Sequence, residues 1–171
     1  MWYVLWTNAG TEEKTRNMID DHVKRSILTR SIVPYQRTRE IHKEIRMFVD
    51  KLIFFSYVFV ETDHIRDFAK LLQWYPGKNF ILQTGDFFFP IYEEEEYFLP
   101  EMLSVSDIID TSNVYMDSDW VKETCGPMRE CENRITKVVW RKCLAIMEMA
   151  LFGRKVEAAL GPHEVYVPLA G

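Results

Sequence analysis

The side chains in this sequence that could do chemistry do not form the constellation of an enzyme. Cys125, Cys131 and Cys143 include no CxxC pair, and the four histidines stand apart without an HExxH spacing. Residues 93–96 are four glutamates, but successive helical positions point around the axis, so at most two could share a metal. No GxxxxGK[ST], GxGxxG or GxSxG motif is present. We therefore expect no catalysis, no metal and no cofactor, and a chain that acts by binding.

The composition is that of a globular protein. The 171 residues include 21 basic and 26 acidic side chains, for a net charge of −5, and 47% are hydrophobic. No apolar run reaches the roughly 18 residues of a membrane-spanning helix, and no basic segment precedes Trp2. With three cysteines and no disulfide pattern, a reducing cytoplasm is the expected location. The chain is also expected to be a monomer.

Residues 1–103 are predicted to form an α+β domain. Strands are expected at residues 2–7, 53–61 and 80–83, a charged hairpin at 31–49, and helices at 11–25, from 63 to Pro76, and at 93–99. Thr11 is the expected N-cap of the first helix. This order predicts an antiparallel sheet with helices on one face. The other face, left free, must be polar or serve a partner.

Residues 104–117 are rich in Ser, Asp, Thr and Asn and are predicted to be a linker. Residues 118–171 follow as a small all-β domain. Its five expected strands lie at 120–124, 134–139, 143–151, 155–160 and 164–167. The alternation of Ala145, Met147, Met149 and Leu151 with other residues is typical of a small barrel with one face inward.

Three blocks carry a resemblance to a known family: WYVLWTNAG, IFFSYVFVET and GPMRECENRITKVVWRKCLAIMEMALFGRKVEAALG. In this order and spacing they resemble the NusG family of transcription elongation factors, with a NusG-type N-terminal domain and a C-terminal KOW domain. Among specialised members, the chain is most similar to antiterminators of the LoaP type. It departs from the family at Phe55-Ser56, where Pro-Gly is usual, and at Glu130 and Asn133, where glycine is usual.

The resemblance implies that aromatic residues on the free sheet face bind the clamp helices of RNA polymerase. The matching residues are Trp6, Phe54, Tyr57, Phe59 and Phe80. Large rings contribute most of the apolar area at interfaces, which suits this role. The alternative is that this aromatic stripe belongs to the core.

The resemblance also implies that the second domain binds a structured leader RNA, such as a hairpin. The candidate residues are Lys122, Arg129, Arg134, Lys137, Arg141, Lys142, Arg154 and Lys155. Because residues 118–171 carry eight basic and seven acidic side chains, a solvated surface with scattered charges is the alternative. A basic hairpin tip at Arg37, Arg39, Lys43 and Arg46 is a further nucleic-acid candidate, with a solvent-exposed hairpin as its alternative.

In housekeeping members of the family, the barrel edge binds a ribosomal protein or the termination factor Rho. The matching residues here are Met128, Leu151, Phe152 and Arg154, which imply a secondary protein-binding role. The predicted function is antitermination: one domain holds RNA polymerase while the other reads the leader RNA, which promotes read-through of terminators. The alternatives are a general elongation factor that couples polymerase to the ribosome or Rho, and an RNA-binding KOW protein of ribosome assembly.

Overall fold

The computed structural model of the chain describes residues 1–43, 45–75, 80–81, 83–84, 87–91, 107–117, 120–126, 134–139, 144–148 and 155–159. Two compact units are present: Met1–Val33 with Phe54–Glu96, and Pro34–Ile53 with Tyr97–Gly171. This division places the hairpin after Val33 in the second unit. The domain boundaries expected from the sequence stay a prediction.

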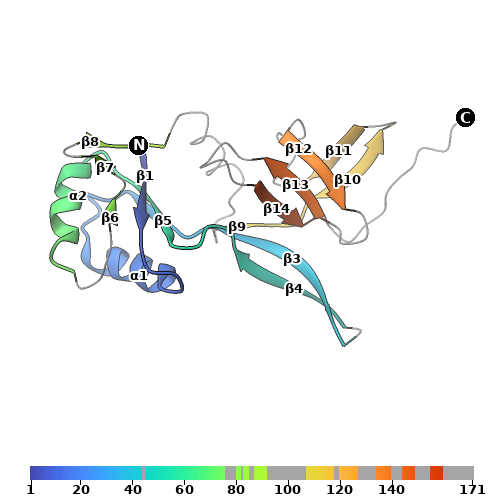
Figure 1. The fold of residues 1–171 in the computed structure, drawn as a ribbon, viewed down its shortest axis with the longest axis horizontal. Helices are drawn as coiled ribbons and strands as arrows, with labels where there is room; N and C mark the ends of the chain where they lie inside the picture. The colour runs from blue at the N-terminus through green and yellow to red at the C-terminus, as the bar shows by residue number, and fades with distance from the viewer. Residues whose placement is uncertain are drawn as a thin grey trace, which may run out of the picture. The chain divides into compact units, whose positions relative to one another are not determined.

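A four-stranded antiparallel sheet forms the base of the first unit. Its strand order is β2 (Arg30–Ile32), β5 (Tyr57–Glu61), β1 (Trp2–Trp6) and β6 (Phe80–Ile81). β1 pairs with β5 along its full length and with β6 at Leu5 and Trp6, so β1 lies between two neighbouring strands (Figure 1). A short ladder of β7 (Gln83–Thr84) and β8 (Phe87–Phe88) follows.

The two central strands of this sheet are buried on both faces. In β1 the side chains from Trp2 to Leu5 are buried, and in β5 those from Val58 to Val60 are buried. Branched and aromatic residues favour such a position because they fill the space on both sides of the pleat. The prediction of an antiparallel α+β unit is confirmed. The prediction that one sheet face stays free is wrong for these central strands.

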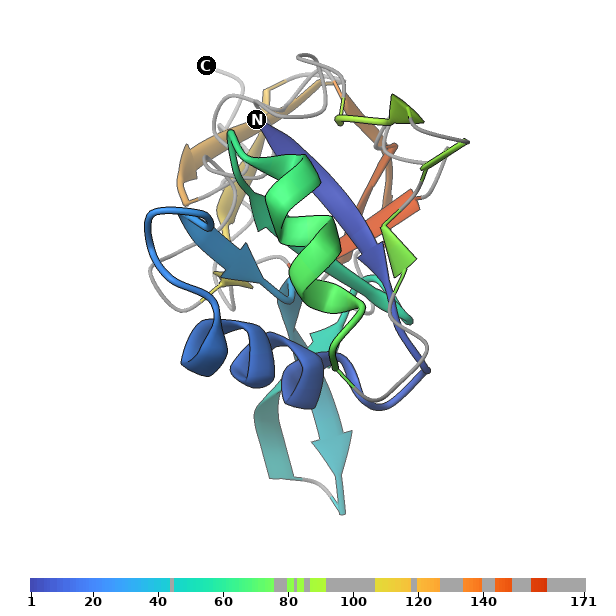
Figure 2. The same cartoon turned by 90° about the vertical axis from the view of Figure 1, so that its left-hand side faces the viewer.

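Two helices pack on the sheet. α1 (Glu12–His22) follows β1 with Thr11 as its N-cap, as predicted, and packs on β2 and β5 through buried residues that include Ile19. α2 (Ile65–Leu72) buries Phe68 and crosses in front of β1 (Figure 2). The expected helix at residues 93–99 lies outside the described residues. Among the described residues, no helix has both the length and the hydropathy of a membrane-spanning segment.

The hairpin of the second unit consists of β3 (Tyr35–His42) and β4 (Ile45–Leu52), a two-stranded ribbon in Figure 1. Its expected limits, 31–49, are corrected, because Ser31 and Ile32 belong to β2 and pair with β5, whereas pairing with β3 continues to Leu52. The strand expected at 53–61 is also shorter. Residues 53–56 form a turn, and β5 begins only after it.

The segment after residue 106 adds to this hairpin. β9 (Ile108–Ile109) pairs in parallel with the start of β3, and the Tyr35 N–H donates to the Asp107 carbonyl at 3.0 Å. Ile109 is buried. Part of the segment expected to be a linker is therefore paired to the hairpin, and β10 (Asn113–Asp117) begins soon after it.

The rest of the second unit is antiparallel. β10 pairs with β11 (Trp120–Cys125), and a second sheet has the order β12 (Ile135–Val139), β13 (Leu144–Glu148), β14 (Lys155–Ala159). Four of the five strands expected here are confirmed; β12, β13 and β14 have narrower bounds than expected, and β11 extends one residue further. The fifth, at 164–167, lies outside the described residues. Ala145 and Met147 are buried, as their alternation predicted.

Candidate functional site

Three of the aromatic residues predicted to bind a partner lie in one row across the first sheet. Trp6 of β1 is directly opposite Tyr57 of β5 on one side and Phe80 of β6 on the other. Residues directly opposite each other in a sheet share a face. Trp6 and Tyr57 are half-buried, whereas the side chain of Phe80 lies outside the described part. The structure therefore brings these three positions together.

The other two predicted residues, Phe54 and Phe59, belong to the core. They are 1% and 0% exposed, and their rings meet edge to face with centroids 5.3 Å apart. Phe59 lies between Val4 and Ile32 on neighbouring strands, where no solvent reaches it. The expectation that these two rings stay exposed for a partner is wrong. Of the two interpretations of the aromatic stripe, the core interpretation holds for this pair.

Phe55 is an exposed aromatic residue that the sequence reasoning missed. It lies in the turn between β4 and β5 and is 62% exposed. Its position could have predicted this exposure. Phe55 lies at the turn where the resembled family carries Pro-Gly, and the tip of a turn faces solvent. Phe55 precedes Tyr57 of that row by two residues in the chain. We name Trp6, Phe55 and Tyr57 the aromatic corner.

The next residue of that turn, Ser56, has a left-handed backbone, with φ of +70°. Glycine adopts this conformation without a steric penalty, which explains why glycine is usual here and why serine is a departure. The Ser56 peptide is held from both sides. Its carbonyl accepts a hydrogen bond from the Thr7 N–H at 2.8 Å, and its N–H donates to Glu12 Oε1 at 2.7 Å.

Glu12 is a buried carboxylate at the first position of α1, only 3% exposed. Burial raises its pKa, but hydrogen bonds from the backbone N–H groups of Ser56, Glu12 and Gly10 lower it, and the net pKa is below the ordinary value. Glu12 is therefore ionised at neutral pH. Its charge is stabilised by backbone donors and by the N-terminus of the helix.

Three threonine hydroxyls connect the end of β1 to the start of α1. Thr7 Oγ1 lies 3.0 Å from Thr11 Oγ1 and 2.9 Å from Thr15 Oγ1, and Thr11 Oγ1 donates to the Asn8 carbonyl at 2.7 Å. Thr7 and Thr15 are buried. These bonds fix the start of α1, and with it Glu12, beside the turn that carries Phe55.

The charged hairpin of the second unit is cross-linked by an arginine. Arg37 donates to both carboxylate oxygens of Asp50, at 2.9 and 3.2 Å, and to Asp110 Oδ1 at 3.2 Å. These bonds raise the pKa of the Arg37 guanidinium, chiefly through the bond to Asp50. Arg37 was expected at a basic tip. It lies in the body of the hairpin instead, engaged with two acidic residues.

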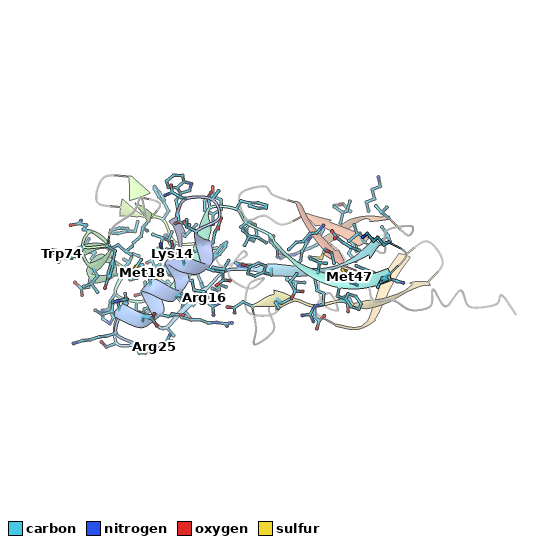
Figure 3. The ribbon with its side chains drawn as sticks, turned by 90° about the horizontal axis from the view of Figure 1, so that it is seen from below. Lys14, Arg16, Met18, Arg25, Met47 and Trp74 are labelled. Atoms are coloured by element: carbon cyan, nitrogen blue, oxygen red, sulfur yellow. The ribbon has the colours of Figure 1, made fainter. Side chains whose placement is uncertain are left out.

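The outer half of the hairpin exposes apolar side chains. Ile45, Met47 and Phe48 are all exposed, and Met47 is labelled in Figure 3. Lys43 is also exposed, at the turn with φ of +47°. In the first unit, Trp74 just beyond α2 is 85% exposed (Figure 3). The sequence did not single out Ile45, Met47, Phe48 or Trp74 as exposed apolar residues.

The predicted basic residues of the second unit are described only in part. Arg134 is half-buried just before β12, and Lys137 is exposed on β12. Lys155 begins β14 and Lys122 lies on β11. Arg129, Arg141, Lys142 and Arg154 lie outside the described residues, as do Met128, Leu151 and Phe152. The RNA-binding and secondary protein-binding assignments therefore stay predictions.

Acidic residues alternate with the basic ones in the β12–β13–β14 sheet. By register, Lys137 lies opposite Ile146, which lies opposite Glu157, and Lys155 lies opposite Glu148. This part of the sheet has no continuous basic row.

Among the described residues, no group of three or more His, Cys, Asp or Glu could hold a metal ion.

The fold and the aromatic corner define a small α+β module that presents rings at the end of a sheet. The fold resembles that of the structure reported as "Domain interaction in Thermotoga maritima NusG", at 16% identity and a TM-score of 0.53, with 93% of each chain covered. The structure reported as "Crystal Structure of MjSpt4:Spt5 complex conformation B" gives 12% identity over 93% of this chain and 92% of that chain. Its TM-score of 0.39 is too low to support an argument.

The family profile described as "Transcription termination factor nusG" matches residues 1–97, more than half of the sequence. The chain belongs to the NusG family of transcription factors. The matched residues include the aromatic corner, Glu12 and the hairpin. A comparison with curated proteins finds no match.

Proposed function

We propose that the chain is a transcription elongation factor that binds RNA polymerase through the aromatic corner. The observation that carries this proposal is the position of Trp6 and Tyr57, partly exposed cross-strand neighbours at the end of β1 and the start of β5, with the exposed Phe55 two residues before Tyr57 in the chain. Rings in a fixed backbone lose little entropy on binding and supply large apolar contact areas. The family membership of residues 1–97 points to transcription as the process.

The clamp helices of the polymerase are the proposed docking site. A helical tip presents side chains that can pack between rings, and binding there would favour the closed, elongating form of the enzyme. The site is smaller than the sequence suggested. Phe54 and Phe59 support the site from the core and do not touch the partner. Phe80 remains a proposed polymerase-binding residue.

For the second unit we propose binding of a structured leader RNA, which would make the protein an antiterminator that promotes read-through. The support is the sequence resemblance, with exposed Lys137 as the described residue in that role. The acidic positions in the same sheet limit the electrostatic contribution. RNA shape, read by a few basic side chains, suits this surface better than a general attraction to phosphates.

The polymerase proposal is tested by titrating labelled full-length protein with core RNA polymerase. Trp6→Ala and Phe55→Ala are each expected to weaken binding by about tenfold or more, the size of a central interface residue. Trp74→Ala is the matched control: it removes an even more exposed ring, beyond α2. Equal affinities for the wild-type protein and both corner variants would refute the proposed docking surface.

The RNA proposal is tested by binding of the full chain to candidate leader RNAs over a range of salt concentrations. Lys137→Ala should lower the slope of log K against log salt by about one if it contacts a phosphate. Lys70→Ala, an exposed lysine on α2, is the control. If no leader RNA binds more tightly than an unrelated hairpin, the protein is a general elongation factor and the antitermination proposal is wrong.

A further inference from the structure

The turn that presents Phe55 is held in a backbone conformation that its own residues do not favour. Ser56 sits at φ +70°, where a side chain crowds the backbone. In a free turn of this sequence, Ser56 would leave the left-handed region for most of the time. Something outside the turn must therefore hold it, and the structure shows two contacts that do so.

The first contact is backbone to backbone. The Thr7 N–H donates to the Ser56 carbonyl at 2.8 Å, which continues the pairing of β1 with β5 by one residue. Any residue at position 56 could accept this bond, since it uses only the main chain. This hydrogen bond uses the Ser56 carbonyl, so the Ser56 N–H still needs an acceptor.

The second contact depends on one side chain. The Ser56 N–H donates to Glu12 Oε1 at 2.7 Å, across 44 residues of sequence. The carboxylate is buried, and the Thr7, Thr11 and Thr15 hydroxyls fix the start of its helix. A hydrogen bond to an ionised, buried acceptor is among the stronger hydrogen bonds in proteins. Glu12 is therefore placed to decide which conformation the turn adopts.

We propose that Glu12 is a positioning residue for partner binding: from α1 it holds the Ser56 peptide left-handed and so fixes the direction in which Phe55 and Tyr57 are presented. Glu12 does not itself touch the partner. This inference rests on the proposed function for its consequence in binding, but its geometric part stands without it. The chain combines a non-glycine residue at a glycine position with an external carboxylate that compensates.

The geometric part is tested by NMR on the full chain. The Ser56 amide proton should resonate downfield and shift upfield as Glu12 is protonated at acid pH, and Glu12→Gln should abolish that titration. Glu13→Ala is the matched control, because Glu13 lies on the same turn of α1, is half-exposed and pairs with Arg16 instead. A Ser56 amide that does not respond to Glu12 would overturn the inference, whatever the protein binds.

The functional part is tested by affinity for core RNA polymerase. Glu12→Ala should weaken binding by about tenfold, because only a fraction of the molecules would then hold the corner in its competent form. Ser56→Gly in the Glu12→Ala background should recover most of that loss, since glycine adopts the left-handed conformation without help. A purely structural role for Glu12 predicts no recovery.

The outcomes separate the two proposals. If Trp6→Ala and Phe55→Ala reduce polymerase binding but Glu12→Ala does not, the docking surface stands and the positioning role is wrong. If the wild-type chain does not bind polymerase at all, the proposed function fails. The titration of the Ser56 amide then still decides whether Glu12 holds the turn.

Discussion

Phe54→Ala should destabilise the first unit strongly, although Phe54 was first expected to lie on a binding surface. The ring is 1% exposed and packs edge to face on Phe59 at 5.3 Å. Truncating a buried phenylalanine to alanine costs about 3–5 kcal/mol, of which an aromatic pair contributes about 0.5–1.5 kcal/mol. Because a domain is stable by only about 5–15 kcal/mol, this change removes a large part of its stability.

Urea unfolding followed by tryptophan fluorescence measures this effect, since two of the five tryptophans, Trp2 and Trp6, lie in the first sheet. With a slope of about 2 kcal/mol per molar urea, the midpoint should fall by roughly 2 M. Phe55→Ala is the control: one residue away and 62% exposed, it should change the free energy of unfolding by less than about 0.5 kcal/mol. Similar midpoints for the two variants would show that the assignment of one ring to the core and the other to the surface is wrong.

Three further predictions concern single contacts. Ser56→Gly should raise the free energy of unfolding by about 1 kcal/mol in urea titrations, because it removes the strain of a left-handed serine; a loss of stability would contradict this reasoning. The folded pKa of Glu12 lies below its unfolded value, so its contribution to stability is present above pH about 4.5 and is lost as the pH falls through the folded pKa. Glu12→Gln should flatten the dependence of the urea midpoint on pH below about 4.5, and an unchanged slope would argue against a depressed pKa. Arg37→Ala should speed hydrogen exchange of the Tyr35 amide, which donates to Asp107, because the ion pair with Asp110 no longer holds that segment; unaltered exchange would show that the strand pairing alone holds it.

The periodicity of the sequence was sufficient for most regular elements. Thr11 and the glutamates after it marked the start of α1, and the alternation around Ala145 and Met147 identified the buried face of β13. The predicted bounds of an element were wrong where a strand and a turn compete for one run of residues. Ile53 to Phe55 are apolar and read as the start of a strand, but residues 53–56 form a turn and β5 begins only at Tyr57.

The site was predicted less well than the fold, for a physical reason. Alternation assigns Tyr57 and Phe59 to the same sheet face, and this is correct in register. Exposure, however, depends on what packs over each position along that face, and Phe54 covers Phe59 while Tyr57 lies nearer the end. No pattern within one strand contains that information. Likewise, the contact between Glu12 and Ser56 joins residues 44 apart and is visible only in three dimensions.

Residues 107–110 contact the hairpin, so the connection to β10 is not a free linker over its whole length. A flexible linker raises the effective concentration of a second binding site according to its length. Here Asp107 and Ile109 are buried, β9 pairs with β3, and Asp110 is bound by Arg37, so this stretch cannot act as free chain while those contacts hold. Ser112, also buried, directly precedes β10. Only Thr111 and Ser112 lie between the stretch that the hairpin holds and the start of β10, which leaves little chain to act as a flexible tether.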